Sequence, residues 1–246
     1  MTNAIQKLYP STKMSIVLAV ILFTLMMPGY ISQYSVFPIF IIIAFISGVG
    51  TKFLSAFIKS IFVLALFIFV FQCFLIPSDT VIWSKGILTL YKEGLEASLL
   101  MTSKIIAISS SLIWFFLVTP IKDMMFALEK AGFSKKFTFV IYSTIQLIPQ
   151  MKKLSQTILE AQKSRGIETE GSLMIRLRAF LPMLGPLVLS SIQQTEEKVL
   201  ALEARAFSAT VRKSSYYQMS KKPVDYLVVS VIFIGFMIFV WWRFFK

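Results

Sequence analysis

The sequence contains no histidine among its 246 residues and a single cysteine, Cys73. Histidine is both the most common general base and the most common metal ligand in enzymes. A single cysteine cannot form a disulfide within the chain, and Cys73 lies in an apolar run, where a small space-filling role is expected. The sequence therefore predicts a chain that has no catalytic site, no metal site and no cofactor of its own.

The sequence also lacks a nucleotide-binding loop. Its nearest approach, residues 166–172, has two glycines at a suitable spacing but carries Ser172 where the phosphate-binding lysine is needed. If the protein takes part in ATP-driven work, the ATP must be bound by another chain.

Apolar residues are abundant instead. They make up 57% of the chain, with 24 phenylalanines and a mean hydropathy of +0.76, whereas soluble domains are about 45–50% apolar. Long runs without charge indicate helices that cross a bilayer, and a turn signal at Pro28-Gly29 divides the longest run in two. The expected spans are residues 12–28, 34–51, 59–77, 98–119 and 225–242, which predicts an all-α polytopic membrane protein.

Lysine and arginine beside these spans indicate their orientation. Much of the formal net charge of +13 lies in these flanks, so it does not predict a nucleic-acid partner. We expect the flanks to face the cytoplasm, with the N-terminus on that side. They carry Lys7, Lys13, Lys52, Lys59, Lys122, Arg212, Lys213, Lys221 and Lys222. Lys104 falls early in the fourth span, where its amine is expected to reach the interface.

Three regions follow: a membrane region at 1–119, a cytoplasmic region at 120–224, and a last span with the C-terminus at 225–246. Within the cytoplasmic region, Thr119-Pro120 predicts the start of a short helix and Ala131-Gly132 its end. A second, amphipathic helix is expected to run to Ser164 and to be capped by Gly166. A third is expected to begin after Pro182 and Pro186.

A short pattern occurs twice in this region, 40 residues apart. Ser164-Arg165-Gly166 and Ala204-Arg205-Ala206 each place an arginine between small residues at the end of an amphipathic helix. A single cation at a helix C-terminus is explained by the helix dipole, worth roughly 0.3–1 kcal/mol. The repetition favours a second explanation, in which each planar guanidinium enters a narrow groove and pairs with carboxylates or carbonyls. Behind the arginines, apolar stripes that include Leu154, Ile158, Val199 and Leu202 are expected to pack between the two helices.

At these residues the chain resembles the transmembrane (T) component of energy-coupling factor transporters, the ABC-class importers of vitamins and metals. Members of that family carry two Ala-Arg-Gly motifs at the ends of two coupling helices. The two tripeptides match them, with Ser164 and Ala206 replacing the expected alanine and glycine. Further similarities lie at Pro10 with Lys13, Thr119-Pro120, Ala127-Leu128, Gly132, Ile148-Pro149, Glu160-Ala161-Gln162, Pro182 and Leu202-Glu203.

The resemblance implies a non-catalytic scaffold in the cell membrane of a prokaryote. Two ABC-type ATPase subunits would each receive one arginine motif, and a small substrate-binding membrane protein (S component) would reorient against the scaffold during micronutrient uptake. ATP would be bound by the partner subunits.

Three other functions stay open from the residues. A conventional ABC importer permease is suggested by Glu160-Ala161, Gly166 and Leu181-Pro182, although their spacing is about three residues too long and a permease needs one such loop. A lipid-modifying membrane enzyme would be expected to show histidine or carboxylate clusters at the interface. A purely structural membrane anchor is the third possibility.

Overall fold

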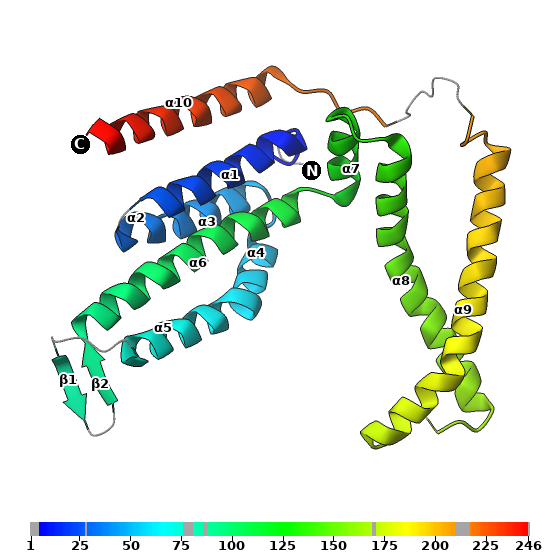
Figure 1. Cartoon of the computed structure of the whole chain (residues 1–246). Coiled ribbons are helices and arrows are strands. Elements are labelled where there is room, and N and C mark those ends of the chain that lie inside the picture. Colours follow the sequence, from blue (N-terminus) through cyan, green and yellow to red (C-terminus); the bar gives the residue numbers. More distant parts are fainter. Residues whose placement is uncertain are drawn as a thin grey trace. The chain divides into compact units, whose positions relative to one another are not determined.

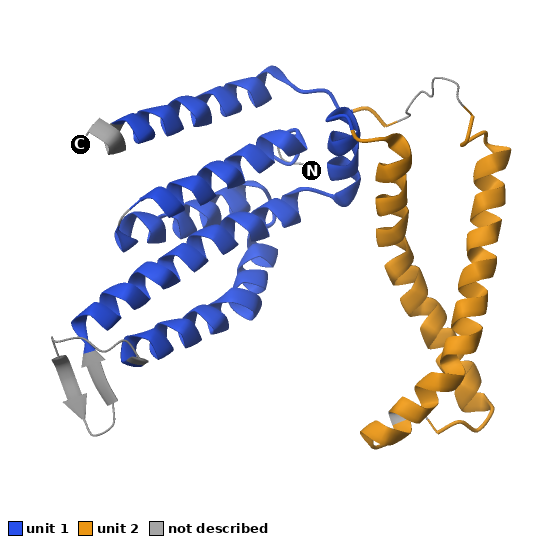
Figure 2. Ribbon diagram, in the orientation of Figure 1, with its two compact units in different colours: residues 1–132, 219–246 blue, residues 133–218 orange. Residues whose placement is uncertain are grey.

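The computed structural model describes residues 5–27, 29–75, 81–85, 88–168, 171–209 and 217–245. It consists of two compact units, residues 1–132 with 219–246 (unit 1) and residues 133–218 (unit 2), coloured separately in Figure 2. The predicted all-α membrane protein is confirmed as the fold class, with a two-stranded hairpin as an addition. The short helix expected after residue 120 belongs to unit 1 and not to the polar region that follows it.

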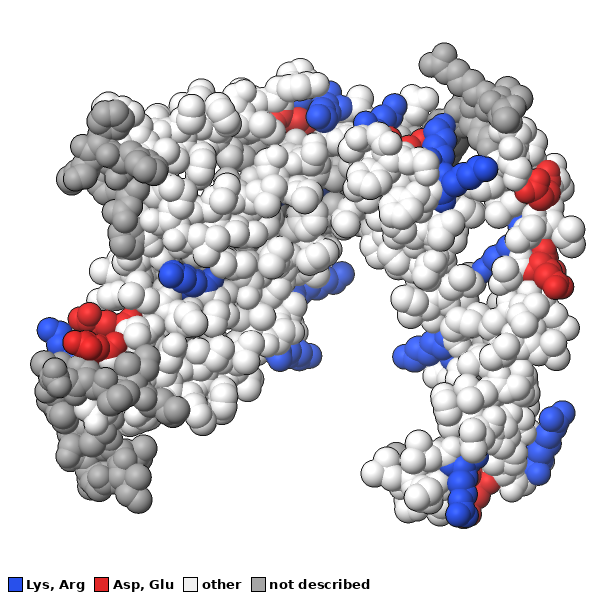
Figure 3. Space-filling model, viewed as in Figure 1, with Lys and Arg blue, Asp and Glu red and all other residues white. Residues whose placement is uncertain are grey.

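Unit 1 contains the apolar helices and is shown with unit 2 in Figure 1. Its helices are α1 (Pro10–Met26), α2 (Tyr30–Tyr34), α3 (Val36–Ile46), α4 (Gly50–Phe57), the π-helix η1 (Ile58–Phe62), α5 (Val63–Leu75), α6 (Lys92–Val118), α7 (Ile121–Lys130) and α10 (Pro223–Phe245). In Figure 3 much of the visible surface of this unit carries no charged side chain, as expected for helices that lie in lipid.

Four helices among the described residues are long and apolar enough to cross a membrane: Gly50–Phe74, Lys92–Val118, Leu173–Ala204 and Pro223–Trp241. Three of them correspond to the predicted third, fourth and fifth spans. The predicted first and second spans correspond to the shorter apolar helices Pro10–Met26 and Tyr30–Ile46. Pro28 and residues 76–77, at the ends of two predicted spans, lie outside the described residues, as do Arg212 and Lys213.

Lys104 lies nearer the middle of its helix than the sequence suggested. Because α6 begins at Lys92, 12 residues before Lys104, and ends 14 residues after it, the lysine sits at the middle of the helix. The helix thus extends about two turns further toward the N-terminus than the predicted span, while the position of Lys104 relative to the bilayer stays a prediction.

The core of unit 1 forms around Trp114 of α6, whose side chain is fully buried. Its ring meets Phe40 of α3 edge to face at 5.7 Å between centroids, and its indole N–H donates to the Ser47 hydroxyl at 3.3 Å. Such a hydrogen bond satisfies the one polar group of a buried tryptophan. A second buried polar contact joins α2 to α6, where the Ser103 hydroxyl donates to the Gln33 amide oxygen at 2.7 Å.

One carboxylate joins the beginnings of α1 and α10. Asp225 is 2% exposed, and its two oxygens accept the backbone N–H groups of Tyr9 at 2.9 Å and Lys222 at 2.7 Å. Tyr9 is the N-cap of α1, and Lys222 directly precedes α10, so Asp225 supplies acceptors that both helix N-termini need.

The buried amine of Lys13 satisfies a helix C-terminus in the same region. It donates to the carbonyl oxygens of Val118, the last residue of α6, at 3.1 Å and of Gln6 at 2.8 Å. A cation at this position is favourable because the C-terminal end of a helix carries unpaired carbonyls and a partial negative charge.

Between α5 and α6 the chain forms a hairpin of β1 (Val81–Lys85) and β2 (Leu88–Tyr91). The strands are antiparallel, with an irregularity between Val81 and Trp83. The sequence analysis assigned no structure to this loop.

Unit 2 is a pair of long helices, α8 (Lys135–Ser164) and α9 (Leu173–Ala204). Ser134 caps α8 by accepting the Phe137 N–H at 3.2 Å, and Gly132, with a φ of 106°, follows the end of α7 as predicted. Pro120, and not Thr119, is the N-cap of α7, since Thr119 ends α6.

The expectation that the third polar-region helix begins after Pro186 is wrong. Helix α9 begins at Leu173 and contains both Pro182 and Pro186. A proline inside a helix removes one backbone hydrogen bond, so an interaction from elsewhere is expected to compensate.

Candidate functional site

The two arginine motifs end their helices with the same backbone geometry. We call residues 162–167 the first tip and residues 202–207 the second tip. Arg165 is the C-cap of α8, with φ −89° and ψ 9°, and Arg205 is the C-cap of α9, with φ −92° and ψ 11°. The repeated sequence pattern is therefore also a repeated structure.

Each tip closes through a pair of backbone hydrogen bonds. In the first, the N–H of Ile167 donates to Gln162 at 3.1 Å and that of Gly166 to Lys163 at 2.9 Å. In the second, Phe207 donates to Leu202 at 3.0 Å and Ala206 to Glu203 at 2.8 Å. This is the Schellman motif, which requires a left-handed residue just after the C-cap.

That left-handed residue differs between the tips. Gly166 has a φ of 83°, and Ala206 has a φ of 57°, the one positive value for a non-glycine residue in the described part of the chain. An L-residue with a Cβ pays roughly 1–2 kcal/mol in this conformation. The second tip is thus strained where the first is not, although alanine keeps the same path.

Both arginines are exposed, as are the small residues around them, Ser164, Gly166, Ala204 and Ala206. Within the residues that the structure describes, neither guanidinium has an ion-pair or hydrogen-bond partner. A free, planar guanidinium at the end of a rigid helix can form two parallel hydrogen bonds to a carboxylate or carbonyl pair of another chain.

The side chains behind each tip hold it in place. The Ser164 hydroxyl donates to the Glu160 carbonyl at 3.1 Å, and the Ser208 hydroxyl donates to the Glu203 carboxylate. Phe207 packs its ring against Phe139, near the start of α8, at 4.8 Å between centroids. The second tip therefore lies near the N-terminal end of α8, and the first tip lies at its other end.

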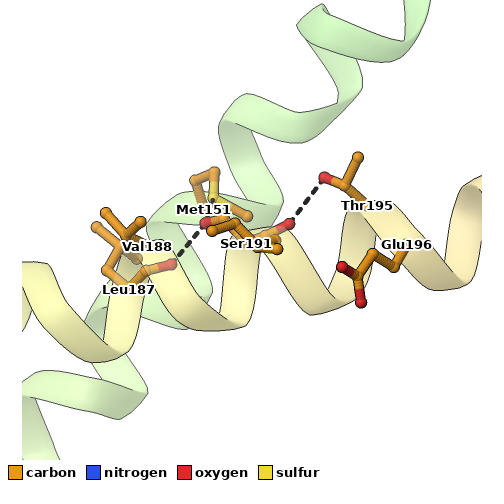
Figure 4. Close-up of a pocket in the computed structure, with 7 residues that line it drawn as sticks. Met151, Leu187, Val188, Ser191, Thr195 and Glu196 are labelled. Atoms are coloured by element: carbon orange, nitrogen blue, oxygen red, sulfur yellow. Dashed lines mark hydrogen bonds between the residues drawn. The ribbon is translucent and has the colours of Figure 1, made fainter.

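The two helices are antiparallel and meet near Met151 and Ser191. The Ser191 hydroxyl lies 3.3 Å from the Met151 sulfur while it donates to the Leu187 carbonyl at 2.6 Å. A groove of about 450 Å³ opens at this crossing, and Figure 4 shows Met151 lying against α9 beside Leu187, Val188 and Ser191. Lys198 adds a hydrogen bond to Gln150 at 3.1 Å.

A third contact joins the helices close to the first tip. Gln162 is 6% exposed, and its side-chain amide donates to the carbonyl oxygen of Pro182 at 3.3 Å. Pro186 has no N–H, so the carbonyl four residues earlier in α9, that of Pro182, lacks its helical donor. Gln162 supplies this donor. The sequence pattern around Gln162 predicted no such role for this side chain.

The four residues predicted to pack between the helices occupy different sides of the crossing. In antiparallel helices that meet at 151 and 191, Leu154 and Ile158 lie beyond the crossing toward the first tip, while Val199 and Leu202 lie toward the second. Val199 is 50% exposed, and the other three are half-buried. Their shared packing role stays a prediction.

Comparison of the sequence with known proteins identifies its family. A sequence profile described as cobalt transport protein, CbiQ, matches residues 1–217. The chain belongs to the CbiQ family. Its relatives include three proteins named energy-coupling factor transporter transmembrane protein EcfT. That of Ruminiclostridium cellulolyticum is 25% identical over 99% of this chain and 95% of its own length. Those of Staphylococcus aureus and Streptococcus thermophilus are 25% and 24% identical, over 93% and 96% of this chain and 88% and 93% of their own lengths.

Membership of the CbiQ family confirms the resemblance to the T component of energy-coupling factor transporters. This chain is thus a membrane component of a transporter and not an enzyme, and as such a component it assembles with other subunits. The CbiQ profile reaches residue 217, so it covers both arginine tips and all of α8 and α9.

Proposed function

We propose that this protein is the membrane scaffold that couples ATP hydrolysis by two cytoplasmic ATPase subunits to reorientation of a substrate-binding membrane subunit. The observation that carries the proposal is the pair of arginine tips, which share one backbone geometry and expose one unpaired guanidinium each. Two equivalent tips suit two equivalent docking sites. The ATP belongs to the partners, because the chain has no phosphate-binding loop.

Each ATPase subunit would bind one tip. The small residues on either side of Arg165 and Arg205 let a groove wall approach the guanidinium closely. The apolar residue that follows each arginine, Ile167 or Phe207, is half-buried against unit 2. It thereby fixes the direction in which the backbone leaves the helix end.

Helices α8 and α9 would carry the movement of the ATPases to the membrane. They are 30 and 32 residues long, roughly 45 Å each, and they are joined at their crossing and at Gln162. A change in the distance between the two tips would then change the angle at which α8 and α9 cross. The two helices would move as rigid bodies, since packed helices have discrete arrangements. The substrate-binding subunit would respond to the apolar face of α9, on which Leu181, Val188 and Leu189 are each more than half exposed.

We place the N-terminus and both tips in the cytoplasm of a prokaryotic cell, with α10 as the last membrane span. The lysines beside the spans support this orientation by the positive-inside rule. Helix α9 also meets the length and hydropathy expected of a span, and its apolar face suits contact with another membrane subunit.

The test is recovery of ATPase subunits with the tagged chain from native membranes. The parent should bring down two ATPase chains and a small membrane protein. Truncating an interface arginine in a desolvated pocket often costs 2 kcal/mol or more, about thirtyfold in affinity. The double variant Arg165→Ala with Arg205→Ala should therefore lose the ATPases.

Arg178→Ala is the matched control, because Arg178 is an exposed arginine near the start of α9 and not at a tip. Full ATPase recovery and full uptake by the double tip variant would refute the docking role. Recovery of a second, similar membrane subunit with a single ATPase contact would instead favour a conventional permease.

A further inference from the structure

Lys104 of α6 is a cation at the centre of a membrane-spanning helix. The helix Lys92–Val118 meets the length and hydropathy of a span, and Lys104 is its thirteenth residue. Its side chain is half-buried, and no acidic partner contacts it among the residues that the structure describes. An ionised amine at this depth is costly unless another group compensates its charge.

The side of α6 next to Lys104 is open and apolar. Met101, one turn earlier, is 49% exposed, and Leu112 and Phe116, two and three turns later, are 36% and 65% exposed. Leu112 lies about 80° around the helix from Lys104, so the amine borders this open side.

The open side continues into a groove of about 400 Å³ between α1, α6 and α7. Leu112 and Phe116 form its α6 wall, Met14 and Leu18 line it from α1, and Ala127 from α7. Small and flexible residues allow another helix to approach closely, as is usual for helix contacts in membranes.

The charged residues nearest the ends of α6 lie far from Lys104 along the helix. Glu96, in the second turn of α6, lies eight residues before Lys104, roughly 12 Å along the axis. The C-terminal end of the helix lies roughly 21 Å from Lys104 in the other direction. A lysine side chain extends about 6 Å. The amine therefore reaches neither the carboxylate-bearing second turn nor the C-terminal end of α6.

We propose that Lys104 pairs with an aspartate or glutamate carboxylate of a membrane helix in another subunit, which packs along the open face of α6. This inference rests on the proposed function, because it takes that helix to belong to the substrate-binding membrane subunit. Charge complementarity selects this occupant: a carboxylate in an otherwise apolar helix needs a cation as much as Lys104 needs an anion.

The experiment compares Lys104→Met, which keeps the side-chain length but removes the charge, with Lys104→Arg, which keeps the charge. Lys59→Met is the matched control, since Lys59 is an exposed lysine in η1 of the same unit. The tagged full-length chain is purified from native membranes, and the ATPases and the membrane subunit are quantified by mass spectrometry. Lys104→Met should lower recovery of the membrane subunit about tenfold or more, while its recovery of the ATPases stays at the parent level. Lys104→Arg and Lys59→Met should recover both the membrane subunit and the ATPases as the parent does.

A charge exchange identifies the partner residue. Lys104→Glu should lose the membrane subunit, and replacing one intramembrane Asp or Glu of that subunit by lysine should restore it. Unchanged recovery with Lys104→Met would overturn the inference. The inference would also be overturned if Lys104→Met lost a bound anionic phospholipid but kept the membrane subunit. A third contrary result is a joint loss of the ATPases and the membrane subunit that no charge exchange restores.

The parent chain separates this inference from the proposed function. If the parent itself recovers neither ATPases nor a membrane subunit, the proposed function fails and the pairing of Lys104 fails with it. If the parent recovers both and Lys104→Met does too, the scaffold function stands and the role of Lys104 alone is refuted.

Discussion

The side-chain amide of Gln162 donates a hydrogen bond to the carbonyl oxygen of Pro182, 20 residues further along the chain. The bond replaces the helical donor that Pro186 lacks. It also fixes the end of α8, and with it the first arginine tip, to the proline-containing half of α9. The N–H that Pro186 lacks in α9 thus leaves a carbonyl free to bind the side chain of α8.

Replacing Gln162 by leucine should weaken this attachment. The Pro182 carbonyl then loses its partner, which costs about 1 kcal/mol for a partly buried acceptor. The apparent melting temperature of the purified chain in detergent should fall by a few degrees. Gln156→Leu, at an exposed glutamine of the same helix, should leave it unchanged.

Pro186→Ala tests whether Gln162 compensates for the proline, because alanine restores an N–H facing the Pro182 carbonyl. In the Pro186→Ala background, Gln162→Leu should cost clearly less than in the parent. A double-mutant cycle measures this difference. Additive effects of the two substitutions would show that Gln162 does not compensate for the proline.

Replacing Ala206 by glycine should stabilise the second tip, since glycine adopts the φ of 57° without strain. The gain is roughly 0.5–1 kcal/mol, after the larger unfolded-state freedom of glycine is subtracted. Ala204→Gly is the matched control, two residues earlier and inside α9, where glycine should destabilise by a similar amount. Equal shifts in melting temperature for both variants would contradict the strained cap.

The sequence predicted those features that neighbouring residues determine. The end of α7 before Gly132 and the two helix ends at Arg165 and Arg205 each depend on about six consecutive residues, so local patterns revealed them. The start of α9 was missed because Pro182 and Pro186 ordinarily end a helix, and the donor that replaces the missing N–H of Pro186 comes from Gln162 in another helix. The start of α6 was placed too late because Glu93 and Glu96 suggested a loop where the helix has already begun.

Replacing Asp225 by asparagine should loosen the junction of α1 and α10. One of its two oxygens becomes an amide that cannot accept an N–H from Tyr9 or Lys222, and a buried negative charge is lost. We expect a loss of roughly 2–4 kcal/mol in the free energy of unfolding. Thermal unfolding in detergent measures this, and Glu96→Gln, at an exposed carboxylate of α6, is the control. Equal stability of the two variants would mean that Asp225 does not carry the junction.

Replacing Met151 by alanine should separate coupling from assembly. Met151 contacts Ser191 at the crossing of α8 and α9, and its truncation enlarges the groove there without touching either arginine tip. The two helices can then slide past each other at the crossing. A displacement of the tips therefore produces a smaller displacement of the rest of α9. In the reconstituted transporter, ATP hydrolysis should persist while substrate uptake per ATP falls by about half or more, because truncation of Met151 leaves a cavity at the contact. Met174→Ala makes the same change at a methionine that is 61% exposed and should leave both rates as they are. Parallel loss of hydrolysis and uptake would indicate misfolding and not uncoupling, and loss of neither would show that the Met151 contact does not transmit movement between the tips and the membrane.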